Sequence, residues 1–263
     1  MSKDLINGYV TTETQNGITT IEFFHPQSNS LPRAILDALA NEIHDAGVDK
    51  ATKVIVLRSA GEKSFCAGAS FNELMQIEDE KKGFHFFSGF ANVINAMRKC
   101  PRLIIARIHG KCVGGGVGIA AAADYAIAVE AADIKLSELA VGIGPFVVGP
   151  AIERKMGLSS FSQLAIDAGM WRNGDWARRK GLYSELHPTI ESMDESVSRL
   201  ADNLAQSNPE AMSEMKKIFW QGTEDWDNVL YSRAEISGRL VLSNFTKDAI
   251  AKFKTKTVDK SVS

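Results

Sequence analysis

Apolar residues in the first half of the chain recur at two different spacings. Near-alternation over residues 18–23 predicts a half-buried strand, and Pro32 then opens a segment with apolar residues three and four positions apart, which predicts a helix. The short β-branched runs over residues 53–58 and 103–108 predict strands that are covered on both faces. Between these two runs, residues 84–98 have helical spacing.

The same order of strand and helix recurs farther along the chain. Three adjacent glycines at 114–116 precede an alanine-rich helix that ends near Ala123. Two more strands are predicted over residues 125–129 and 134–137, and helices follow over residues 149–156, 160–168 and 175–180. Repeated strand-then-helix units are typical of α/β proteins, so an α/β fold is predicted.

From residue 192 onward the pattern changes to helical spacing with almost no strand signal. One of these helices starts at Asn208-Pro209, because proline is favoured in the first helical turn. We therefore expect a core over residues 1–191, which holds binding and catalysis, and a helical C-terminal section over residues 192–263. Such a section often serves as a lid or a subunit contact.

Composition narrows the classes of protein. The chain has 263 residues, 44% of them hydrophobic, and a net charge of −2, which excludes intrinsic disorder and a strongly basic nucleic-acid binder. The longest uncharged stretches, over residues 112–123 and 139–152, fall short of the roughly 20 apolar residues of a membrane span. The first eight residues lack the apolar segment of a secretory signal, so we expect a cytoplasmic protein without a membrane partner.

Cysteines and histidines give no sign of a metal site. The three cysteines lack C-x-x-C spacing, and the five histidines are scattered, so neither a disulfide framework nor a metal or other cofactor is expected. Cys66 lies within a glycine-containing loop, where packing explains it better than a nucleophilic role, since no histidine is adjacent.

Two loops with glycine are candidates for chemistry. Gly68 follows a predicted strand and precedes a helix, so the loop can offer an unpaired backbone N–H, although a tight turn without a ligand explains it as well. The glycines at 114–116 are a stronger signal, because the first N–H groups of a helix are unpaired and its dipole is positive there. Two such donors would form an oxyanion hole, whereas close helix packing is the alternative. No phosphate-binding motif is met.

Together these segments resemble the enoyl-CoA hydratase/isomerase (crotonase) superfamily over most of residues 10–190. The matching stretches are 54–57, 65–69, 101–108, Gly110, 114–116, Asp124, Ala177 and 181–182. Several motifs in the right order and structural context make the match specific. The resemblance implies a crotonase-like spiral of repeated ββα units and a coenzyme A thioester as substrate, with no cofactor.

In that family, two backbone N–H groups hold the thioester oxygen. The resemblance assigns this role to Ala69 and Gly115, which would stabilise a thioester enolate whose charge develops only during the reaction. The neighbouring residues expected to bind the substrate are Ala67, Gly68, Gly114 and Gly116.

Hydratases of the family also use two glutamates, of which this chain keeps one. The first position falls on Gly118 and the second on Glu138, a register that Gly142 and Pro145 support. One carboxylate can remove a proton at C2 and return it at C4, so the resemblance favours double-bond isomerisation of an enoyl-CoA. Hydration of a 2-enoyl-CoA, or the reverse dehydration, is the alternative if Glu73 supplies a second acid, although a solvated helix carboxylate is its plainer interpretation.

The apolar neighbours of Glu138 should raise its pKa and let it act as a base or an acid, whereas a surface or capping carboxylate is the plainer alternative. Pro145 and Phe146 are expected beside the acyl group. Phe146, with the two valines that follow it, replaces residues that are small in the family, so the resemblance does not imply which acyl chain is bound.

Three basic or aromatic positions are candidates for contacts with the rest of CoA. Lys63 precedes the first motif, while Phe253 and Lys256 match residues that reach the nucleotide from a neighbouring subunit, although a charged run there is equally a solvated face. The resemblance implies a homotrimer or homohexamer. A non-catalytic acyl-CoA or RNA-binding member is the remaining alternative, and the near-neutral charge argues against nucleic acid.

Overall fold

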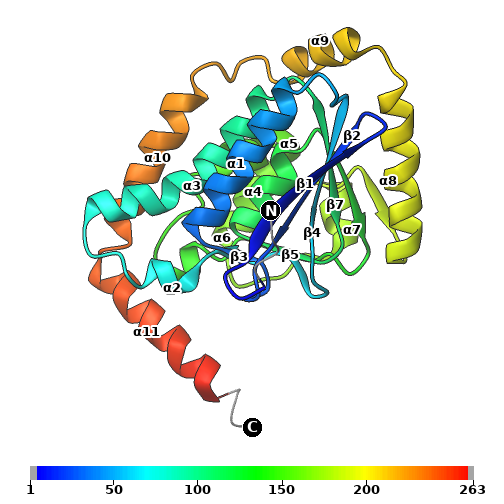
Figure 1. The fold of residues 1–263 in the computed structure, drawn as a ribbon. Helices are drawn as coiled ribbons and strands as arrows, with labels where there is room; N and C mark the ends of the chain where they lie inside the picture. The colour runs from blue at the N-terminus through cyan, green and yellow to red at the C-terminus, as the bar shows by residue number, and fades with distance from the viewer. Residues whose placement is uncertain (1–4, 260–263) are drawn as a thin grey trace.

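A six-stranded sheet with the order β1-β2-β4-β7-β9-β11 runs through the computed structural model, which describes residues 5–259, with side chains up to residue 252 (Figure 1). All neighbouring strands are parallel except β1 and β2. The strands are β1 (Tyr9–Gln15), β2 (Ile18–Phe24), β4 (Val54–Ser59), β7 (Leu103–Ile108), β9 (Tyr125–Val129) and β11 (Glu185–His187). The central strands β4, β7 and β9 are buried almost throughout, as the continuous apolar runs predicted for β4 and β7.

Two smaller parallel sheets lie beside the main sheet. One has the order β10-β8-β5 and the other pairs β3 with β6. Their strands are β3 (Ser30–Leu31), β5 (Ser64–Cys66), β6 (Gly68–Ala69), β8 (Lys111–Val113) and β10 (Ile134–Lys135). A long strand of the main sheet, a short strand and a helix therefore repeat along the chain, which confirms the predicted spiral of ββα units.

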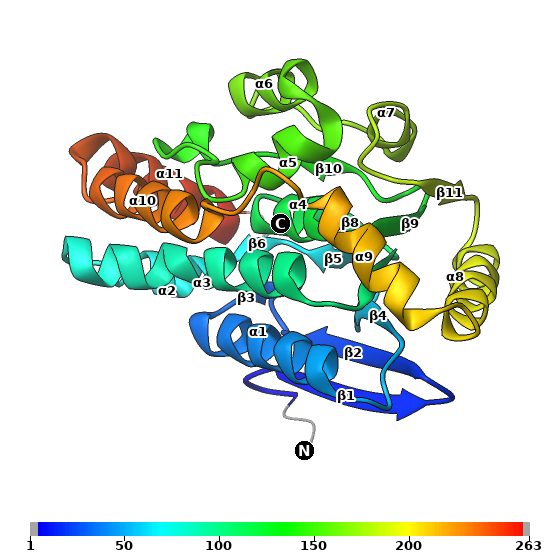
Figure 2. The ribbon, with the colours of Figure 1, turned by 90° about the horizontal axis from the view of Figure 1, so that it is seen from above.

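Helices cover the sheets and fill the space between them (Figure 2). The helices of the first section are α1 (Arg33–Val48), α2 (Phe71–Leu74), α3 (Glu80–Lys99), α4 (Gly115–Ala122), α5 (Gly149–Met156), α6 (Leu158–Ile166) and α7 (Gly174–Arg179), with a short 3₁₀ turn η1 (Leu139–Val141). Every residue of α4 is buried, because glycine, alanine, valine and isoleucine present no polar face.

Differences from the predicted elements have local causes. Helix α3 begins at Glu80, because the Asp79 side chain accepts a hydrogen bond from the Lys82 N–H at 2.7 Å and so caps a polar first turn. The strand predicted over 134–137 ends at Lys135, where the chain turns toward η1. Strands of two or three residues are too short to show periodicity, and the sequence did not predict β5 or β8.

The C-terminal helices pack onto the rest of the chain. They are α8 (Ile190–Ala205), α9 (Pro209–Phe219), α10 (Trp226–Leu240) and α11 (Asn244–Asp259). Buried residues of α8 and α10 belong to the same hydrophobic cluster as the strands, and a functional boundary near residue 192 stays a prediction. Figure 1 shows α11 reaching away from the body of the molecule.

A pair of glycines brings α10 against α3. A Cβ on Gly83 would lie 2.7 Å from the Cα of Gly238, so the backbones of the two helices touch. The two helices run side by side in Figure 2. Among the helices that the structure describes, none has the length and apolar composition needed to cross a bilayer.

Candidate active site

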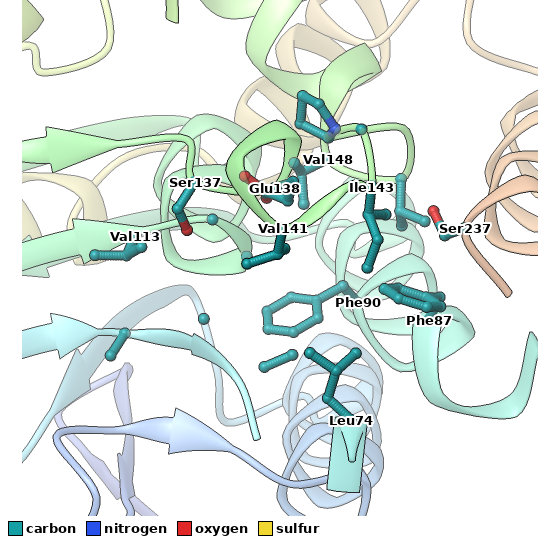
Figure 3. A pocket seen from close by; sticks show the side chains of 18 of the residues that line it. Leu74, Phe87, Phe90, Val113, Ser137, Glu138, Val141, Ile143, Val148 and Ser237 are labelled. Atoms are coloured by element: carbon teal, nitrogen blue, oxygen red, sulfur yellow. The ribbon is translucent and has the colours of Figure 1, made fainter. Parts of the chain in front are cut away.

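A cavity of about 410 Å³ opens between β6, the start of α4, helix α3 and the segment over residues 135–148. Figure 3 shows Glu138 near its middle, with Val113 and Ser137 on one side and Leu74, Phe87 and Ile143 on the other. The predicted site residues that line this cavity are Ala67, Gly68, Ala69, Gly114, Gly115, Glu138, Pro145 and Phe146. The fold thus brings together positions that lie up to 79 residues apart in the sequence.

The two glycine loops meet at this cavity. Gly68 has a φ of +92°, and a Cβ there would lie 3.1 Å from the Val113 carbonyl oxygen and 3.7 Å from the Gly115 nitrogen, so glycine permits both the turn and the close approach. Gly115 is the first residue of α4, and its N–H has no hydrogen-bond acceptor within the described residues. That N–H is therefore available at the positive end of the helix dipole.

Glu138 lies directly before the 3₁₀ turn, and its side chain extends to Gly114. A Cβ on Gly114 would lie 3.0 Å from Oε1 of Glu138, whereas Oε2 is buried without a hydrogen-bond partner within the described residues. Figure 3 shows Val148 next to the carboxylate. Burial in this apolar setting raises the pKa of Glu138 to about 7.

The structure explains why position 118 carries no acid. A Cβ on Gly118 would lie 2.5 Å from Cγ1 and 2.7 Å from Cβ of Val148, which is closer than carbon atoms pack. The valine therefore occupies the space that a side chain on this helix would need. A carboxylate at position 118 would require Val148 to move.

Glu73, the candidate for a second acid, caps a helix in this structure. Its Oε2 accepts a hydrogen bond from the backbone N–H of Arg33, the first residue of α1, at 2.8 Å. Glu73 is absent from the residues that line the cavity. Its position in α2 follows from Ser70, whose hydroxyl accepts from the Glu73 N–H at 3.3 Å.

Other predicted substrate-binding residues lie away from the cavity. Gly116 packs against β5, since a Cβ there would lie 2.3 Å from the Cys66 carbonyl oxygen. Lys63 is exposed on the loop before β5 and does not line the cavity. The side chains of Phe253 and Lys256 lie outside the part of the chain that the structure describes.

Several lining residues were not predicted as site residues. The aromatic side chains of Phe86, Phe87 and Phe90 on α3 face the cavity, and a Cβ on Gly115 would lie 2.1 Å from the Phe90 ring. Their helical spacing was visible in the sequence but indicated only a buried face. Lys135 and Trp171 also line the cavity, and no sequence pattern linked them.

None of the described residues that line the cavity is a cysteine or a histidine. All three cysteines are buried, and burial raises the pKa of Cys66 to about 12, which favours the unreactive thiol. Burial lowers the pKa of His109 to about 4, and His109 is not a lining residue. The described residues contain no group of three or more potential ligands arranged to hold a metal ion.

An available N–H at a helix start faces a cavity that also holds a buried carboxylate without a counter-charge, an arrangement that can bind an oxyanion and exchange a proton. A sequence model of the enoyl-CoA hydratase/isomerase family matches residues 13–258. The chain belongs to this family of acyl-CoA enzymes, as the resemblance predicted.

Individual relatives agree with the family match. The chain is 25% identical over 241 residues to a probable enoyl-CoA hydratase of Bacillus subtilis, covering 91% of this chain and 93% of that one. It is 27% identical over 186 residues to a peroxisomal Δ(3,5)-Δ(2,4)-dienoyl-CoA isomerase of Arabidopsis thaliana, covering 65% of each. The crystal structure of an enoyl-CoA hydratase from Bacillus halodurans shares the fold, with a TM-score of 0.86, 21% identity and coverage of 93% and 99%.

Proposed function

We propose that the protein isomerises the double bond of an enoyl-CoA, with Glu138 as the single proton shuttle. One observation supports this choice of reaction above the others. Of the described residues that line the cavity, Glu138 alone carries a carboxylate, and Val148 fills the space beside Gly118 where a second acid would stand. Hydration by two carboxylates needs both groups to hold the water, whereas a double-bond shift needs one.

The proposed reaction begins with the carboxylate form of Glu138. It removes a proton from C2 of a 3-enoyl-CoA, and the electron pair moves onto the thioester oxygen. The N–H groups of Ala69 and Gly115 stabilise the resulting enolate, at the positive end of α4. The protonated Glu138 then delivers the proton to C4 as the C2–C3 double bond forms, which restores the carboxylate and conjugates the product with the thioester.

The pKa of Glu138 is suitable for a group that must both accept and donate a proton. A pKa of about 7 leaves comparable amounts of the acid and the base at neutral pH, which is where such a shuttle works best. We expect kcat/KM for a 3-enoyl-CoA to rise with pH through about 7, as the base form appears. The aromatic side of the cavity, with Leu74, Phe87 and Phe90, suits an apolar acyl group.

The first experiment follows the absorbance of the conjugated thioester with two medium-chain substrates offered separately. Gain of conjugation from a 3-enoyl-CoA is the expected result. Loss of conjugation from a 2-enoyl-CoA, with ¹⁸O from labelled water in the product, would replace isomerisation by hydration, the activity named for several relatives. No change with either substrate would refute the proposal and favour a member that only binds acyl-CoA.

A pair of variants tests the assignment of the carboxylate. Glu138→Gln keeps the shape of the side chain but cannot take a proton, so turnover should be lost. Glu73→Gln is the matched control, because Glu73 lies outside the cavity and its amide oxygen can still accept the Arg33 N–H. Equal losses in both variants would reinstate Glu73 as a second acid.

We further propose that the chain assembles as a homotrimer or homohexamer, in which Phe253 and Lys256 approach the CoA bound by a neighbouring subunit. Support comes from exposed apolar side chains near the cavity, Leu139 on η1 and Phe245 on α11, which are 50% and 68% exposed. Analytical ultracentrifugation tests this proposal, and a monomer at micromolar concentration would refute it.

A further inference from the structure

Two lysines flank one tryptophan at an end of the cavity. The Nζ atoms of Lys111 and Lys135 lie 4.9 Å and 5.5 Å from the centre of the Trp171 ring, within the range of cation–π attraction. Trp171 is 41% exposed, and both Trp171 and Lys135 line the cavity.

Strands β8 and β10 and the backbone of Arg172 hold this cluster in place. Lys135 on β10 pairs in register with Val113 on β8, the strand that begins with Lys111. Arg172 exchanges backbone hydrogen bonds with Ile134 at 2.8 Å and 3.0 Å, which fixes the neighbouring Trp171 beside Lys135. The cluster is therefore built on paired backbone rather than on a free loop.

The positive charges of the cluster lack a counter-charge. Within the described residues, neither Lys111 nor Lys135 forms a salt bridge, whereas Lys82, Lys99 and Lys216 each pair with a carboxylate. Two ammonium groups held near one ring repel each other, and an anion bound close to both would relieve that repulsion. The cluster thus has the charge of an anion-binding site at the mouth of a cavity.

The two ends of the cavity differ in chemistry. Figure 3 shows Leu74, Phe87 and Ile143 at one end and Val113, the register partner of Lys135, at the other, with Glu138 between them. An apolar acyl group favours the aromatic end. A substrate whose thioester lies beside Gly115 then extends its other half toward the lysines.

We propose that Lys111, Lys135 and Trp171 form a binding site for the phosphate groups of CoA, an inference that rests on the proposed acyl-CoA function. Lys111 precedes Gly115 by four residues, which is at most about 14 Å of extended backbone, and its side chain reaches farther. The pantetheine arm separates the thioester from the phosphates over a comparable length. Lysine binds phosphate as a point charge, and Trp171 keeps both ammonium groups at the mouth.

The test measures binding of free CoA by isothermal titration calorimetry and therefore needs no turnover. Lys135→Met and Lys111→Met should each raise the Kd for CoA about tenfold, and the loss should shrink at high salt. The matched control is Lys180→Met, because Lys180 lies 6.0 Å from the ring of Trp176, a tryptophan that does not line the cavity. Lys135→Arg keeps the charge and should retain most of the affinity.

Truncated substrates identify the anion. The lysine variants should bind acyl-pantetheine thioesters, which lack the phosphates, as well as the wild type does. A second probe is a pantetheine thioester whose acyl group carries a carboxylate. If the lysine variants lose affinity for this probe but keep their affinity for CoA, the site binds the acyl group and the proposal is wrong. Wild-type affinity for CoA in both lysine variants would also overturn it. If CoA binding depends on the lysines but no acyl-CoA is turned over, the proposed isomerisation is refuted and the proposed phosphate site is not.

Discussion

Two carboxylates buried in this protein have opposite surroundings. Asp124, just before β9, accepts hydrogen bonds from the Ile104 N–H at 2.8 Å and from Nε1 of Trp220 at 3.2 Å. It also pairs with Nζ of Lys216 at 2.8 Å, and both side chains are less than a tenth exposed. Glu138 has no cation beside it, and its Oε2 has no partner within the described residues.

The difference separates a carboxylate with a structural role from the one that we propose as the proton shuttle. A buried charge is stable when it is paired and hydrogen-bonded, and Asp124 joins β7, β9 and the end of α9 in this way. An unpaired carboxylate instead binds a proton more tightly, which is the property that proton transfer near neutral pH requires. Burial alone therefore does not indicate a catalytic acid, whereas burial without a counter-charge points to one.

The largest expected effect concerns the reactive carboxylate. Glu138→Gln should lower kcat for the active acyl-CoA by about 10²- to 10⁴-fold, because no other described residue that lines the cavity carries a carboxylate. Steady-state kinetics on the folded variant measures this loss. Near-wild-type turnover on every acyl-CoA tested would show that Glu138 is not the proton shuttle. The contrast between Glu138 and Asp124 would then have no bearing on catalysis.

The structural carboxylate is tested by removing its partner. Lys216→Met leaves the charge of Asp124 buried and unpaired, so the free energy of unfolding should fall by about 3–5 kcal/mol, as measured by urea denaturation. Lys217→Met is the matched control, since Lys217 pairs with Glu214 in solvent, and it should change stability by less than about 1 kcal/mol. Similar stability of both variants would show that the buried pair contributes little.

The unpaired carboxylate should also make stability depend on pH. The pKa of Glu138 is about 7 in the folded protein and about 4.5 in the unfolded chain, so the folded state binds the proton more tightly. Stability from this group is fully present below about pH 4.5 and is lost as the pH rises through 7.

Glu138→Gln should therefore be more stable than the wild type by up to about 3 kcal/mol at pH 8.5 and equal to it near pH 4. Thermal unfolding of both proteins across this range provides the measurement. A difference that does not vary with pH would show that burial does not perturb Glu138.

A smaller effect is expected where Val148 fills the place of the second acid. Gly118→Ala sets a methyl group against Val148 and should destabilise the protein by about 1–3 kcal/mol. Val148→Ala in the same chain should recover part of the loss, so a double-mutant cycle is the appropriate measurement. Additive effects of the two changes would show that position 118 has room to spare.

The sequence predicted the elements that local pattern governs. Strands β7 and β9 and helix α5 have the predicted bounds, because uninterrupted apolar runs and helical spacing are properties of neighbouring residues. The resemblance placed Glu138 in the site by its spacing from Gly142 and Pro145, and the structure puts it in the cavity.

What the sequence could not predict depends on contacts between distant residues. Glu73 was a candidate acid until the structure showed it bound to Arg33, 40 residues away. The cluster around Trp171 joins residues as many as 60 positions apart, and neither lysine is distinguished by its neighbours in the sequence. Such arrangements follow from strand register rather than from local pattern.

The contact between Gly83 and Gly238 sets the distance between helices α3 and α10. Both helices contribute residues to the wall of the cavity. Helix α3 carries the three phenylalanines, and α10 carries Ser237, next to Gly238. Neither glycine lines the cavity, yet a methyl group on either would force these helices apart. The pair works as a spacer that sets the width of the cavity between these two helices, although neither glycine is part of its wall.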